Sequence, residues 1–146
     1  MLIIGEWKLR DDGVTRPIVQ ASVRGSGGNL VAADFLIDSG ADRTVFSAAL
    51  PRRLRLPATN AQPDFSLTGI GGTSDFVLVT TVLEFTGADG RPVRVRGEFA
   101  GFTDPAATDL SVLGRDVLDN FDLIISRRRN EILLLAPRHQ YRIEGN

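Results

Sequence analysis

Apolar and polar residues alternate along most of the chain with a period of two, which predicts strands rather than long helices. The longest alternation covers residues 30–37 and leads directly into Asp38. The expected buried face of this strand carries Val31, Ala33, Phe35 and Ile37. Further strands are expected at residues 2–9, 17–23, 44–46, 65–68, 76–79, 81–85, 93–99, 121–125 and 132–135. Glycine-rich or polar turns join the last six of these segments into three predicted hairpins.

Helical signals are short and few. Ser47 is placed to cap a brief helical piece, which Pro51 keeps from extending. After the strand-like residues that follow Leu110, the period becomes helical, and Val117, Leu118 and Phe121 share one face. The chain is therefore predicted to be all-β, with one short helix in its C-terminal half.

Composition narrows the class of function. The 146 residues suit a single domain, and 17 basic residues against 18 acidic ones give no electrostatic footprint for nucleic acid. Cysteine is absent and His139 is the single histidine, which excludes disulfides, thiolate nucleophiles and Cys- or His-rich metal sites. Glu6 and Lys8 interrupt the apolar start, and no run reaches the ~18 apolar residues of a membrane span. We expect a soluble, cytoplasmic protein without metal, nucleic-acid or membrane partners.

The segment Asp38-Ser39-Gly40 places an acid and a hydroxyl side chain at the end of the strand with the longest alternation. An acid at the end of a buried strand costs free energy unless its charge is compensated, so such a group is kept where its protonation or position is used. The hydroxyl of Ser39 can lock the turn, and Gly40 lets another backbone, carboxylate or water approach closely.

A second unusual segment is the hairpin tip Gly69-Ile70-Gly71-Gly72, because a large apolar residue stands at a loop tip. Two interpretations stay open from the local sequence. Ile70 either packs back onto the sheet, or it forms the apolar tip of a mobile flap that covers a ligand and excludes water.

Together with Leu113-Gly114-Arg115-Asp116, these two segments give the chain a resemblance to the retropepsin-like aspartic proteases, over about residues 17–135. The resemblance implies a closed acid-protease barrel formed by one domain, residues 1–146. It also implies a homodimer in which each subunit contributes one Asp38. The sequence agrees with this, since it holds one Asp-Ser-Gly and no second copy. A two-fold axis would place Asp38 beside its symmetry mate.

The resemblance also assigns roles around this acid. Ser39 would bond across the two-fold axis, and the N–H of Gly40 would lie close to the carboxylates. Ala41 cannot donate a side-chain hydrogen bond to the carboxylate, which predicts activity nearer weakly acidic to neutral pH than that of a pepsin. Arg115 would form an ion pair with Asp42, worth ~0–1 kcal/mol if exposed.

The flap of such an enzyme would be formed by Gly69, Ile70, Gly71 and Gly72, with Ile70 and Gly71 at its tip. Two neighbouring Asp carboxyls that share one proton would activate a water and polarise the scissile carbonyl of a peptide or protein substrate, with no cofactor or metal. About thirty residues follow Arg115, and the N-terminal arm is longer than viral proteases need. The resemblance therefore does not determine which residues form the dimer contacts.

Three functions compete at this level. The leading one is an aspartic endopeptidase that cuts an extended peptide. The second is a catalytically silent, dimeric peptide-binding module with the same fold. The third, a sugar hydrolase with a carboxylate pair, would need a second acid at a set separation, and no acid stands in a comparable motif.

Overall fold

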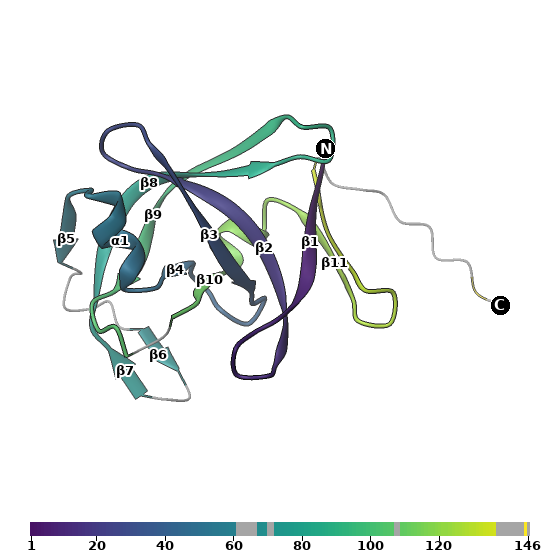
Figure 1. Cartoon of the computed structure of the whole chain (residues 1–146), viewed down its shortest axis with the longest axis horizontal. Helices are drawn as coiled ribbons and strands as arrows, with labels where there is room; N and C mark the ends of the chain where they lie inside the picture. Colours follow the sequence, from purple (N-terminus) through teal and green to yellow (C-terminus); the bar gives the residue numbers. More distant parts are fainter. Residues whose placement is uncertain (61–66, 70–71, 107–108, 137–144, 146) are drawn as a thin grey trace.

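The computed structural model describes residues 1–60, 67–69, 72–106, 109–136 and 145. Within these ranges the chain is built almost entirely of strands (Figure 1). The strands are β1 (Leu2–Leu9), β2 (Thr15–Arg24), β3 (Leu30–Ile37), β4 (Val45–Phe46), β5 (Ala58–Asn60), β6 (Leu67–Gly69), β7 (Gly72–Ser74), β8 (Phe76–Thr86), β9 (Pro92–Phe102), β10 (Ser111–Leu113), β11 (Asp122–Ser126) and β12 (Glu131–Leu135). The helices are α1 (Ala49–Leu54) and α2 (Arg115–Leu118).

Six of the strands close into a barrel. They follow one another in the order β2-β3-β10-β4-β9-β8, and β2 pairs again with β8 through Ser22↔Glu84 and Val23↔Leu83. The all-β prediction and the closed barrel are confirmed. Closure removes free strand edges from this part of the sheet, which is one way in which β proteins avoid edge-to-edge association.

The barrel encloses large apolar side chains that the strand alternation turns inward. Burying each of them contributes roughly 1.5–3 kcal/mol, so this core supplies much of the driving force for closure. The predicted inner face of β3 is confirmed, since Phe35 is fully buried and contacts Phe46 edge to face at a centroid distance of 6.0 Å. Other fully buried members are Ile18, Val23, Leu54, Leu83, Phe85 and Leu113.

The centre of the barrel combines parallel and antiparallel pairing. Strand β10 runs parallel to β3, with Val112 opposite Leu36 and Leu113 opposite Ile37. On its other side β10 pairs antiparallel with β4, where Val112 faces Val45. The chain therefore leaves β3, turns through residues 38–44 and returns as β4 on the far side of β10. This path brings the end of β3 next to the start of α2.

Two of the three predicted hairpins are present, and the third has a different partner strand. Strands β8 and β9 form a long hairpin in which Phe85 faces Val93, and β11 and β12 form the C-terminal one. The predicted pairing of residues 65–68 with 76–79 is wrong. Strand β6 instead pairs with the nearer β7, Leu67 opposite Ser74, while β8 is occupied by β9 and β5. The long β8–β9 ladder and β5 fill both edges of β8, so the shorter β7 remains for β6.

The two ends of the described chain pair with each other. In β1, Leu2 faces Leu135 of β12, and further along the same strand Glu6 faces Ile18 of β2. The resulting order β11-β12-β1-β2 extends the barrel sheet on the side opposite α1 and β5 (Figure 1). The longer terminal segments noted in the sequence thus pair with each other within one chain.

The helices differ from the prediction in number. The expected helix after residue 114 is α2, and α1 is a second helix that carries Pro51 in its first turn. Pro is tolerated there because the first N–H groups of a helix have no partner within it. Ser47 is not the cap residue, since the helix starts from Ala48 and Ser47 accepts a backbone bond from Leu50 N–H at 3.0 Å. No helix in the described ranges is long and apolar enough to cross a membrane.

Candidate active site

Asp38 stands where β3 ends and its turn begins. Its backbone N–H donates to the carbonyl of Leu113 at 3.1 Å, which continues the β3–β10 pairing by one residue. Its own carbonyl accepts from Ala41 N–H at 3.1 Å, which closes the turn. The side chain is half-buried in this single subunit. The parallel strand therefore anchors the backbone of this residue while leaving its carboxylate accessible.

Gly40 lies directly against this carboxylate. Its backbone N–H donates to Asp38 Oδ1 at 2.9 Å, and a Cβ at this glycine would stand 3.2 Å from the same oxygen. This hydrogen bond holds the carboxylate oxygens of Asp38 in one orientation. Ser39 is exposed, as is Gly40, so the outer side of the turn is open in one subunit.

The turn after Asp38 rests on the start of α2. Arg115 N–H donates to the carbonyl of Ala41 at 2.8 Å, and Asp116 N–H donates to the carbonyl of Asp42 at 3.3 Å. Gly114 makes this approach possible, because a Cβ there would lie 2.3 Å from the carbonyl carbon of Arg43. The segment 113–116 is therefore the support of the acid turn, and its glycine is required by packing against backbone.

A buried threonine joins the same two segments, and the sequence did not reveal it. Thr44 is 0% exposed, and its backbone N–H and its hydroxyl both donate to Asp116 Oδ1, at 2.9 and 2.7 Å. The hydroxyl oxygen also accepts from Gly114 N–H at 3.0 Å. Losing one partner of such a buried group costs ~1–3 kcal/mol. A polar residue before the apolar pair Val45–Phe46 was the available signal, but its partner is 72 positions away.

The predicted ion pair between Asp42 and Arg115 is present. Arg115 Nη2 donates to Asp42 Oδ1, and the two side chains are 52% and 79% exposed, in that order. In one subunit this is an exposed pair, which contributes ~0–1 kcal/mol to the free energy of unfolding. Removing one partner costs more in a buried ion pair than in an exposed one, and this pair would be buried only if a second chain covered it.

The flap prediction falls partly outside the described residues. Gly69 and Gly72 face each other in the β6–β7 pairing. Ile70 and Gly71, the predicted tip itself, lie outside the described residues. Both interpretations of Ile70 therefore stay predictions.

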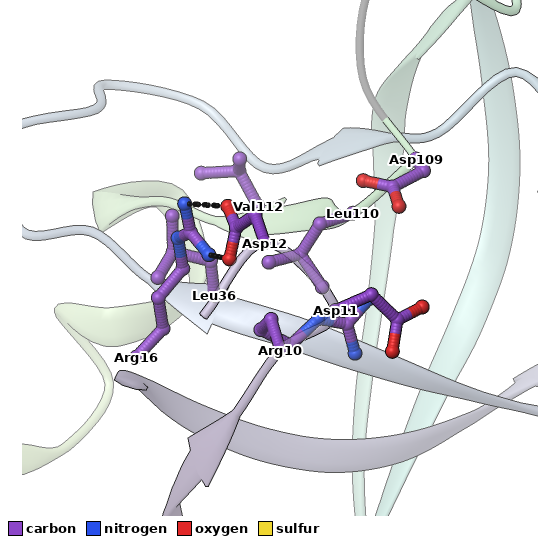
Figure 2. A pocket seen from close by; sticks show the side chains of 8 residues that line it. All are labelled: Arg10, Asp11, Asp12, Arg16, Leu36, Asp109, Leu110 and Val112. Carbon is purple, nitrogen blue, oxygen red and sulfur yellow. Dashed lines mark hydrogen bonds and ion pairs between the residues drawn. The ribbon is translucent and has the colours of Figure 1, made fainter. Parts of the chain in front are cut away.

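A cavity of about 500 Å³ lies against β3, where Leu36 forms part of its lining (Figure 2). Leu36 stands two residues before Asp38, so the two side chains project from the same face of the strand. Its neighbour in the parallel register is Val112 of β10, and these two side chains, with that of Leu110, form the apolar part of the lining. The sequence does not reveal this cavity, because its walls come from three segments that are distant in the chain.

The rim of this cavity holds a forked ion pair. Arg16 Nη1 and Nη2 donate to Asp12 Oδ1 and Oδ2 at 2.9 and 2.6 Å, and Val14 N–H donates to Asp12 Oδ1 at 3.0 Å (Figure 2). The guanidinium of Arg16 lowers the pKa of Asp12 from 3.8 to about 2, with a smaller contribution from the N–H of Val14. Asp12 therefore stays ionised throughout the physiological range.

This pair predicts a pH dependence of stability. Because the pKa of Asp12 in the folded chain lies below its unfolded value, the interaction is fully present above about pH 4 and is lost as the pH falls towards about 2. Asp12→Asn is expected to reduce the fall in unfolding free energy between about pH 5 and 2, measured by urea denaturation. Asp119→Asn, at an exposed site, is the control. Equal slopes for Asp12→Asn and wild type would contradict the prediction.

No group of three or more His, Cys, Asp or Glu side chains within the described ranges could hold a metal ion. The chemistry that the site offers is that of one accessible carboxylate with a backbone donor, beside an apolar cavity with a charged rim.

This combination of a closed barrel, an Asp-Ser-Gly turn after β3 and a supporting Gly-Arg-Asp segment is the architecture of the retropepsin-like proteins. The model of the family "Retroviral aspartyl protease" matches residues 14–126. The chain therefore belongs to the retroviral aspartyl protease family.

Two solved structures show the same fold. EIAV protease in complex with the inhibitor HBY-793 is 21% identical, with a TM-score of 0.51, over 72% of this chain and 86% of that one. A retropepsin-like aspartic protease from Rickettsia conorii is 17% identical, with a TM-score of 0.55, over 92% of this chain and 88% of that one. No curated protein sequence is significantly similar to the chain.

Proposed function

We propose that the protein is an aspartic endopeptidase, active as a homodimer in which each subunit contributes Asp38. The observation that carries this proposal is the position of Asp38, which is anchored by Leu113, oriented by the N–H of Gly40 and still accessible. One subunit supplies one such acid. A two-fold axis through the outer side of the turn would bring two of them together, with Ser39 beside the axis.

The proposed reaction uses a shared proton. Two carboxyls at hydrogen-bond distance do not both ionise, so one is charged and the other is protonated, as in other aspartic proteases. The charged Asp38 takes a proton from the water that attacks the scissile carbonyl carbon, while the protonated one hydrogen-bonds the carbonyl oxygen. The roles exchange when the amine leaves with a proton. Water and carboxyl groups suffice, so the proposal includes no cofactor and no metal.

The cavity beside Leu36 suits a substrate side chain. A peptide extended across the face that carries Asp38 would place a side chain near the scissile bond over the floor formed by Leu36 and Val112. The hairpin that includes Gly69, Ile70, Gly71 and Gly72 would cover the peptide as a flap. The exposed Asp42–Arg115 pair would then lie at the edge of the dimer contact. We place this activity in the cytoplasm.

Subunit mixing tests the shared site. Wild-type chain and Asp38→Asn chain are unfolded together in equal amounts, refolded and assayed on a peptide library. If each site needs one Asp38 from each of two chains, heterodimers are inactive, and activity falls to about one quarter of that of the same total of wild-type chain. Independent active subunits would retain about one half. That result would overturn the shared site.

A further inference from the structure

The cavity beside Leu36 is lined by charged residues that take no part in the proposed reaction. Its apolar side consists of Leu36, Leu110 and Val112, a surface on which the methylene groups of a long side chain can pack. The remaining lining is charged, with three carboxylates against two guanidinium groups, so its net charge is −1. A cavity of this composition favours a ligand with an apolar stem and a cationic end.

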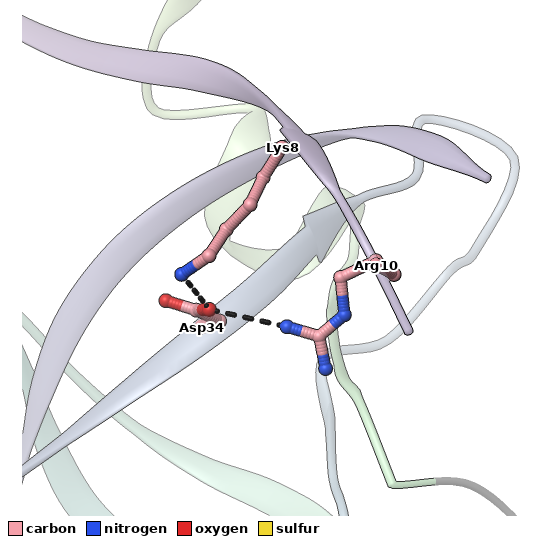
Figure 3. Close-up of polar contacts among 3 residues, drawn as sticks. All are labelled: Lys8, Arg10 and Asp34. Atoms are coloured by element: carbon pink, nitrogen blue, oxygen red, sulfur yellow. Dashed lines mark hydrogen bonds and ion pairs between the residues drawn. The ribbon is translucent and has the colours of Figure 1, made fainter. Parts of the chain in front are cut away.

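Both guanidinium groups of the lining already have partners. Arg16 is held by the fork to Asp12, with both Nη atoms bonded. Arg10 Nη1 donates to Asp34 Oδ2 at 3.3 Å, away from the cavity, and Lys8 Nζ reaches the same oxygen at 2.6 Å (Figure 3). These cations are therefore poorly available to an acidic ligand, because binding one would require breaking an existing ion pair.

Two carboxylates of the lining are in the opposite situation. Asp11 and Asp109 are exposed, and neither forms a hydrogen bond or close ion pair with another part of the chain that the structure describes. Figure 2 shows both on the side of the cavity away from the Arg16–Asp12 fork. The hydrogen bonds to Asp12 are the main cause that raises the pKa of Arg16, and Asp109 adds to this effect through space alone. The carboxylates of Asp11 and Asp109 are thus available to a ligand at one side of the cavity entrance.

We propose, on the basis of the endopeptidase function above, that this cavity selects a lysine or arginine side chain of the substrate within two residues of the scissile bond. The stem of that side chain packs on Leu36 and Val112, and its cationic end meets Asp11 and Asp109. The position follows from the strand geometry, since Leu36 and Asp38 are two residues, or about 6.6 Å, apart. A two-fold dimer presents the cavity twice, so a basic residue is selected on either side of the cleaved bond.

The test compares peptides that differ in charge and little else. Otherwise identical peptides carry lysine or norleucine at each position within two residues of the scissile bond, and kcat/KM is measured for each. The wild-type enzyme is expected to prefer lysine over norleucine by about tenfold at one position on each side of the scissile bond, as for a charged hydrogen bond that is partly screened. Raising the salt concentration should reduce this preference.

Variants identify the groups responsible. In the double variant Asp11→Asn with Asp109→Asn, the preference for lysine is expected to fall below about threefold. Asp89→Asn, which removes the same type of charge from the exposed turn between β8 and β9, should keep it. A wild-type enzyme that cleaves the norleucine peptides equally well or better would overturn the proposal. So would a lysine preference that the double variant retains.

Binding separates this inference from the proposed function. The affinities of the lysine and norleucine peptides for the dimeric Asp38→Asn protein are measured by calorimetry, which needs no turnover. A lysine preference in binding that the double variant loses supports the cavity assignment even if wild type cleaves no peptide, a result that would contradict the endopeptidase function alone. Equal affinities of the two peptides contradict the cavity assignment whether or not cleavage occurs.

Discussion

Replacing Asp38 by Asn is expected to lower kcat by at least about 100-fold, because proton transfer by a positioned carboxyl contributes roughly 10²–10⁴ to the rate. An amide cannot take the proton of the attacking water. The substitution keeps the shape of the side chain, and the amide oxygen can still accept from Gly40 N–H, which donates to Asp38 Oδ1 at 2.9 Å. Cleavage is measured on a peptide library over about pH 4–8.

Two controls make this result specific. The unfolding free energy and the dimer content of Asp38→Asn should equal those of wild type, and Asp89→Asn should cleave as wild type does. An Asp38→Asn protein with more than about a tenth of wild-type activity would exclude the acid from the reaction. If wild type itself cleaves nothing while it dimerises and binds peptides, the chain is the silent peptide-binding module instead.

Gly114→Ala is expected to destabilise the fold by about 3 kcal/mol or more, at the upper end of what overpacking costs. The new Cβ would lie 2.3 Å from the carbonyl carbon and 2.4 Å from the carbonyl oxygen of Arg43, and 2.8 Å from the backbone nitrogen of Thr44. These atoms belong to backbone and have no rotamer with which to move away. The acid turn would have to separate from α2, which breaks the bonds of Thr44 to Asp116.

Urea denaturation at pH 7 measures this loss, and peptide cleavage shows whether the displaced turn still holds Asp38. Gly27→Ala is the matched control. Its Cβ would meet nothing closer than Asn29 Oδ1 at 3.8 Å, and its φ lies outside the left-handed region. A Gly114→Ala protein within about 1 kcal/mol of wild type would show that residues 41–44 adapt without cost.

Local sequence patterns predicted the strands well where the pattern decides burial directly. The alternation in β3 turned Phe35 and Ile37 inward and delivered Asp38 to the end of the strand. The C-terminal hairpin and the part of the β8–β9 hairpin next to its turn followed from alternation and turn residues alone, although residues 76–79 continue β8 instead of forming a separate strand. These are short-range features, since the pairs next to each turn lie only a few positions apart, Thr86 with Pro92 and Ser126 with Glu131.

Pairing between distant segments was the part that local patterns did not predict. A three-residue strand such as β10 has too little sequence to name its neighbours, yet it separates β3 from β4. Strand β1 likewise gave no sign that its partner would be β12, at the other end of the described chain. The pairing of β6 with β7 rather than β8 depended on β5 and β9 already occupying the edges of β8.

The candidate site divides in the same way. Asp38 and Gly40 lie two positions apart in the sequence, so the turn that joins them could be predicted. Arg115 was assigned to Asp42 only through a family resemblance. The bonds of Thr44 to Asp116 and the cavity above Leu36 were missed. Each needs the chain to be folded before its members meet.

The sequence by itself thus determined an all-β chain with one acid turn, because alternation and turn residues act over a few positions. The tertiary structure alone decided what supports that acid and what lies beside it. Burial of the apolar faces closes the barrel, and closure brings residues 10–12, 16, 36, 109, 110 and 112 around one cavity. Hydrophobic burial is non-directional, so it does not by itself choose which residues become neighbours. The geometry of the complete barrel decides which residues line the cavity.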